Sequence, residues 1–79
     1  MHYEVIRSVT DKSIHLIFKE GTFGTLPDLI RHLGPWRGLI GGNITSLKAH
    51  YRAQLAEQGF VMLYQHVASF TAEAGSAAA

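Results

Sequence analysis

Alternating apolar and polar residues near the start of the chain predict a β-hairpin. Tyr3–Val9 is rich in β-branched residues that polar ones interrupt, and Ser13–Lys19 carries an apolar residue at every second position of one face. A period of two residues is typical of a strand. The polar residues Thr10-Asp11-Lys12 separate the two segments. We therefore expect two strands joined by a short turn.

The apolar pattern then changes to the period of a helix. Thr25 can cap a helix with its hydroxyl group, and Pro27 and Asp28 suit its first turn. Gly34-Pro35 then ends it, because proline cannot continue a helix. We expect about two turns, with the following apolar stripe packed on the sheet: Leu26, Leu29, Ile30 and Leu33.

A second helix is expected to start near Asn43 or Thr45, after a loop at Pro35–Gly42 that contains three glycines. Gly59 fits the position just past the end of this helix. A third strand, Phe60–Val67, follows with almost no linker. The apolar stripe of the helix is Ile44, Leu47, Tyr51 and Leu55.

Together these segments predict one α+β domain over residues 1–70, followed by a disordered alanine-rich tail at 71–79. The expected order of elements is β-β-α-α-β. Three strands would form a mainly antiparallel sheet, and the two helices would cover one of its faces. We interpret this arrangement as a two-layer sandwich.

Strand alternation divides the side chains of this sheet between a covered face and an open face. The covered face is expected to hold Val5, Ile14, Leu16, Phe18, Val61, Leu63 and Val67. The open face is expected to hold Ile6, His15, Ile17, Met62, Tyr64 and His66. The open set is rich in apolar residues, and contiguous exposed apolar surface usually marks an interface. Ile6, Ile17, Met62 and Tyr64 are therefore the candidate interface for a homodimer or for another protein.

Composition supports a small interaction domain. Among the 79 residues, 47% are hydrophobic and only 16% are charged, so little charge is present to cover the surface. A domain with so small a core gains from self-association. The chain has no cysteine, which excludes disulfides and thiolate metal sites. We expect a cytoplasmic protein, since small secreted domains usually carry disulfides, and no membrane contact, since no apolar run is long enough.

The alternative hypothesis is a small nucleic-acid-binding or regulatory domain. Its candidate residues are Trp36, Arg37, Lys48 and Arg52, which combine an aromatic ring with basic groups. A net charge of +1 is small for such a role. Trp36 could instead fold inward and fill the core. The Gly41-Gly42 pair could hold an anion at a helix start, or could simply be a connection.

Neither catalysis nor a cofactor has a sequence signature here. A Ser or Thr nucleophile needs a base and an orienting carboxylate, and the six acidic residues are scattered along the chain. The histidines lack the spacing of a metal site, so we expect no metal and no cofactor. They stand at His2, His15, His32, His50 and His66. The first hypothesis is therefore a non-enzymatic protein-interaction module.

Overall fold

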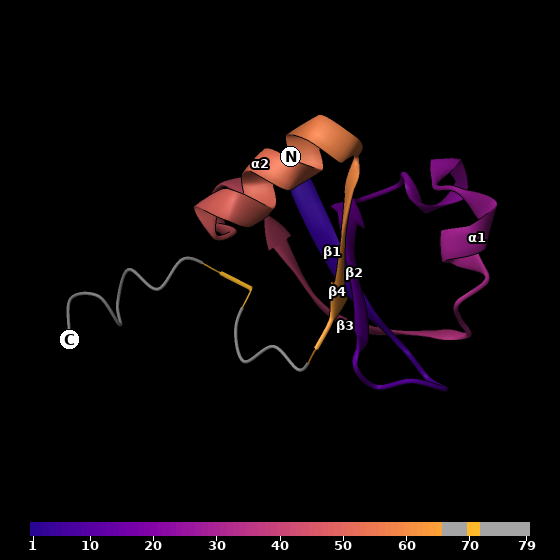
Figure 1. Ribbon diagram of the computed structural model, residues 1–79. Helices are drawn as coiled ribbons and strands as arrows, with labels where there is room; N and C mark the ends of the chain where they lie inside the picture. The colour runs from indigo at the N-terminus through magenta and orange to yellow at the C-terminus, as the bar shows by residue number, and fades with distance from the viewer. Residues whose placement is uncertain (66–69, 72–79) are drawn as a thin grey trace, which may run out of the picture.

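The computed structural model describes residues 1–65 and 70–71 and has an antiparallel sheet with two α-helices (Figure 1). The predicted α+β class is confirmed. The strands are β1 (His2–Ser8), β2 (Ile14–Lys19), β3 (Trp36–Asn43) and β4 (Phe60–Tyr64). The helices are α1 (Asp28–Arg31) and α2 (Ala49–Gln58), with short 3-10 helices η1 (Phe23–Thr25) and η2 (Ile44–Ser46).

The sheet has four strands in the order β3-β1-β2-β4, and every neighbouring pair is antiparallel. The prediction of three strands was wrong because Trp36–Asn43, interpreted as a glycine loop, pairs with β1 along its length. The element order is therefore β-β-α-β-α-β. The β1–β2 hairpin is confirmed, and its turn is held by Asp11, whose Oδ1 accepts a hydrogen bond from the Ser13 backbone N–H at 3.0 Å.

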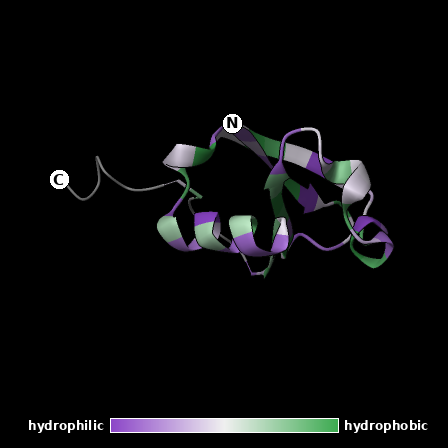
Figure 2. Cartoon of the chain, turned by 90° about the horizontal axis from the view of Figure 1, so that it is seen from above, coloured by the Kyte–Doolittle hydropathy of each residue, from purple (hydrophilic) through white to green (hydrophobic). Residues whose placement is uncertain are grey.

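Helix α2 covers one face of the sheet. Tyr51 and Leu55 turn inward from α2, as the sequence predicts, and Gly59 ends the helix in a left-handed conformation with φ 87°. Figure 2 shows hydrophilic and hydrophobic residues alternating along its turns. The inward side of α2, together with Leu47 and Phe70, closes a core over four strand residues: Tyr3, Val5, Ile17 and Val61. We call this side of the sheet the α2 face.

The opposite face is also covered. Leu26, Phe23 and Ile30, from the segment that holds η1 and α1, pack there on a second apolar cluster. Its strand members are Ile6, Leu16 and Phe18, with Trp36, Phe60 and Met62 packed against them. In Figure 1, α1 and α2 lie on opposite sides of the sheet. The predicted two-layer sandwich with both helices on one face is therefore wrong.

Both helices are shorter than their sequence patterns predict. Helix α1 spans only Asp28–Arg31, and Leu29 is 84% exposed. Before α2, Asn43 caps the 3-10 turn η2 rather than the helix itself, accepting a hydrogen bond from the Thr45 N–H at 3.0 Å. Among the described residues, no helix has the length and apolar character needed to span a bilayer.

The end of the domain extends to the last described residue. Phe70 is buried in the core on the α2 face, and Thr71 pairs with Leu47 in an isolated β-bridge. The bridge joins Thr71, the first residue of the tail predicted for 71–79, to the domain. The remainder of that tail, 72–79, and the predicted strand residues 66–67 lie outside the described residues.

Candidate interaction edge

The four residues predicted to form one open sheet face do not share a face. Ile17 is fully buried on the α2 face, whereas Ile6 and Met62 belong to the cluster on the opposite face. Tyr64, at the end of β4, is 68% exposed. The strands carry apolar residues on both sides because both sides are covered, which is the pattern of a doubly buried sheet. An interface therefore needs another surface.

The exposed apolar surface of the sheet is concentrated at the β3 edge. Six of the eight residues of β3 are exposed, and Leu39 and Ile40 are 41% and 46% exposed. β3 pairs with β1 on one side only, so its outer backbone groups face away from the sheet. The other edge strand, β4, is shorter, and Tyr64 is its single exposed residue. An exposed apolar edge is the part of a sheet most prone to pair with another chain.

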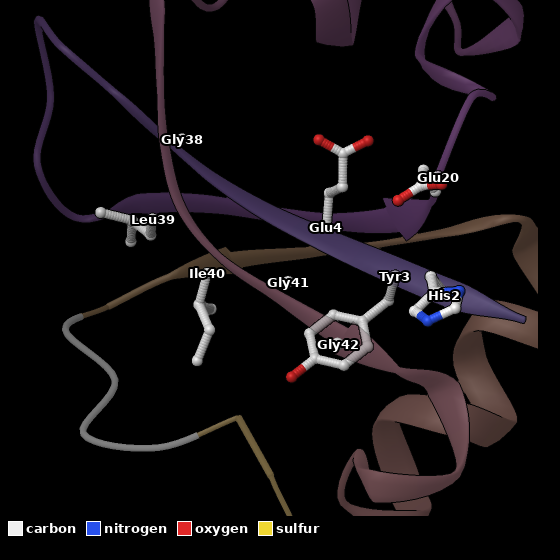
Figure 3. A pocket seen from close by; sticks show the side chains of 9 residues that line it. All are labelled: His2, Tyr3, Glu4, Glu20, Gly38, Leu39, Ile40, Gly41 and Gly42. Carbon is white, nitrogen blue, oxygen red and sulfur yellow. The ribbon is translucent and has the colours of Figure 1, made fainter.

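Glycines shape the surface beside this edge. An open hollow of about 570 Å³ runs along β1 and β3, where Gly38, Gly41 and Gly42 leave the backbone bare. Figure 3 shows Glu4 on one side of the two strands and Tyr3 and Ile40 on the other. A second chain could approach this stretch of backbone without meeting side chains from those three positions.

Gly41 and Gly42 also explain why β3 can pair with β1. A Cβ atom at Gly41 would lie 3.1 Å from the Tyr3 carbonyl oxygen, and one at Gly42 would lie 3.3 Å from Cε1 of the Tyr3 ring. Both contacts are closer than most side chains tolerate. The two glycines thus lie within β3, paired with Glu4 and Tyr3, and α2 begins only at Ala49. The sequence-based idea of an anion site at that helix start is not supported by this placement.

The four residues of the nucleic-acid alternative fall into two groups, Trp36 with Arg37 on β3 and Lys48 with Arg52 at the start of α2. Trp36 is half-buried in the cluster opposite α2, and its Nε1 donates to the Arg31 carbonyl oxygen at 2.9 Å. The interpretation that Trp36 fills the core is therefore the one that the structure supports. Arg37 is exposed on β3, and Lys48 precedes α2. Arg52, on α2, lines a different hollow with Met1 and Lys19.

The strand pairs of β1 show how far Arg37 lies from Arg52. Arg52 shares a hollow with Lys19, so Lys19 marks its level on the sheet. Lys19 pairs with Tyr3, and Arg37 pairs with Arg7. These two levels lie four residues apart on β1, a distance of about 14 Å at about 3.4 Å per residue. Arg37 and Arg52 therefore lie at different ends of the sheet.

The buried polar side chains of residues 1–65 and 70–71 lie apart from one another. The two buried polar side chains are Ser8 and His15. They lie on opposite faces, since Ser8 pairs with Trp36 while His15 packs its ring on Phe70 at a centroid distance of 5.8 Å. Within the same residues, no three His, Asp or Glu side chains lie close enough together to hold a metal. His66, predicted beside His15, lies outside the described residues.

The β3 edge has no clear strand signature in the sequence, because glycine disfavours strands on its own. Three glycines and a proline in Pro35–Gly42 are typical of a loop. The apolar pair Leu39-Ile40 between these glycines was the available signal for a strand. No family model, curated protein or solved structure matches the chain.

Proposed function

We propose that this chain is a non-enzymatic protein-interaction module that homodimerises by pairing β3 with β3 of a second copy. The observation that carries the proposal is the edge position of an eight-residue strand with exposed Leu39 and Ile40. Antiparallel pairing of the two edges would join two four-stranded sheets into one. It would also cover apolar surface on a domain that has little charge.

Two-fold symmetry suits this edge. A two-fold interface uses the same patch on both copies, so it must be complementary to itself. The register shift between Val5 and Ile6 leaves Leu39 as an extra residue of β3 and divides the strand. Pairing over the regular segment Ile40–Asn43 would place no charged residue opposite another. Arg37, the charged residue of β3, would lie outside the paired segment.

The expected dimer is weak. Edge pairing over so few residues buries less than the roughly 1,200 Å² of a stable interface. We therefore expect a dissociation constant on the order of 10 µM to 1 mM. Such a dimer would assemble and separate with changes in protein concentration.

The nucleic-acid alternative has less support. Its basic residues lie at different ends of the sheet, and its aromatic residue is engaged in packing. A non-enzymatic role is favoured by the placement of Ser8 and His15 on opposite faces, which keeps a hydroxyl and a base apart.

Sedimentation velocity over a range of concentrations tests the proposal. Ile40→Lys puts a charge on the edge and should hold the protein as a monomer. Leu29→Lys is the matched control, because Leu29 is an exposed apolar residue on α1 and is not part of β3. We expect a concentration-dependent dimer for the unchanged chain and for Leu29→Lys. A monomer at all concentrations up to about 1 mM, or equal dimerisation of the two variants, would overturn the proposal.

A further inference from the structure

Arg7 and Arg37 lie directly opposite each other on β1 and β3. Opposed residues of an antiparallel pair have Cα atoms about 4.5–5.5 Å apart and point to the same face. Like charges in this position destabilise a sheet. The pair thus has an energetic cost in the free protein, and a ligand of opposite charge would offset it.

These two side chains stand where the core on the α2 face ends. On β1 that core includes Tyr3 and Val5, and Arg7 is the next residue on the same face. Helix α2 makes more contacts with β4 and β2 than with β1 and β3. His15, opposite Arg7 on the other side, is 4% exposed and closes the apolar boundary.

Two carboxylates are directed away from the arginine pair. Asp28 forms an ion pair with Arg31. Of the two acidic residues nearest to Arg7 in the chain, Glu4 points to the other face of the sheet. Asp11 accepts hydrogen bonds from the Ser13 N–H and hydroxyl group.

One nitrogen of the Arg7 guanidinium lacks an acceptor. Its Nε is shielded from solvent and has no hydrogen-bond partner. Turning this side chain toward a ligand would give Nε an acceptor. A buried donor without an acceptor is uncommon in folded proteins.

We propose that Arg7 and Arg37 form a binding site for a small phosphate-bearing molecule. Each guanidinium presents a planar fork of N–H groups that suits paired oxygen atoms. A phosphate group has enough terminal oxygens to serve both forks at once, whereas a carboxylate has two. The site rests on opposed charges on one face of the sheet. It is therefore independent of the dimer proposed for the β3 edge.

A titration with inorganic phosphate, monitored by amide NMR, tests the site. The ionic strength is held constant, with chloride as the balancing anion. We expect saturable shifts at Arg7, Arg37 and His15. Arg37→Gln should weaken binding about tenfold, the loss typical of one charge-assisted group. Arg52→Gln removes the same charge from α2 and should leave the affinity within about twofold. Arg37 is exposed, so its replacement should leave the fold intact.

Three results would overturn the proposal. The first is the absence of saturable binding up to about 10 mM phosphate. The second is an equal loss of affinity in Arg37→Gln and Arg52→Gln, which would indicate attraction to net charge alone. The third comes from a parallel titration with a single-stranded oligonucleotide. If it binds through Arg37 while inorganic phosphate does not, the basic residues serve nucleic acid and not a small molecule.

Discussion

Leu16 and Ile17 are neighbours in β2, are both fully buried, and belong to two separate apolar cores on opposite faces of the sheet. Leu16 packs with the segment around η1 and α1, and Ile17 packs beneath α2. The sheet is therefore the middle layer of the domain. With both faces occupied, its edges are where further strands can be added.

Truncation of either residue should destabilise the domain strongly. We expect Leu16→Ala and Ile17→Ala each to lower the free energy of unfolding by about 2–5 kcal/mol, because each leaves a cavity in a core. Urea unfolding measures both, and Ile17→Val, at about 0.5–1.5 kcal/mol, gives a milder variant if Ile17→Ala does not fold. A large loss of unfolding free energy for Leu16→Ala, with almost none for Ile17→Val and Ile17→Ala, would instead support a sheet with one covered face and one open face.

The glycines of β3 should differ in their tolerance of a side chain. A methyl group at Gly41 would press on the Tyr3 carbonyl oxygen at 3.1 Å, whereas one at Gly38 would meet nothing within 4 Å. We expect Gly41→Ala to lower the free energy of unfolding by about 1–3 kcal/mol. Gly38→Ala should change it by less than about 0.5 kcal/mol. Urea unfolding of the two variants makes the comparison, and similar values would contradict the close approach of β1 and β3.

Replacing Arg37 should stabilise the free protein. In phosphate-free buffer at low ionic strength, Arg37→Gln removes the repulsion from Arg7 and should raise the free energy of unfolding by about 0.2–1 kcal/mol. The gain should shrink in salt, which screens exposed charges. Arg52→Gln serves as the control. A clear loss of stability in Arg37→Gln would show that Arg37 makes a stabilising contact, and would remove the energetic reason for a ligand.

The sequence predicts local features of this fold better than its layers. Tyr51 and Leu55 face the core, and Gly59 ends α2, because each depends on residues close in the chain. The two faces of β2 could not be separated, since Leu16, Ile17 and Phe18 are consecutive apolar residues and alternation carries no signal in such a run.

The β3 edge could not be predicted because its stability comes from a distant partner. Gly41 and Gly42 disfavour a strand on their own, yet they are what lets this segment approach Tyr3 on β1. The same limit applies to Arg7 and Arg37, which lie thirty positions apart in the chain and meet only through the β1–β3 register. Both candidate sites therefore depend on strand pairing that a single sequence does not show.

Isotope-filtered NMR on a mixture of labelled and unlabelled protein at high concentration tests the dimer through β3 most directly. We predict intermolecular contacts between backbone protons of Ile40–Asn43 in one copy and the same segment of the other, in an antiparallel register. Contacts that instead connect Tyr64 or another part of β4, or no intermolecular contact at all at about 1 mM, would contradict an interface at the β3 edge.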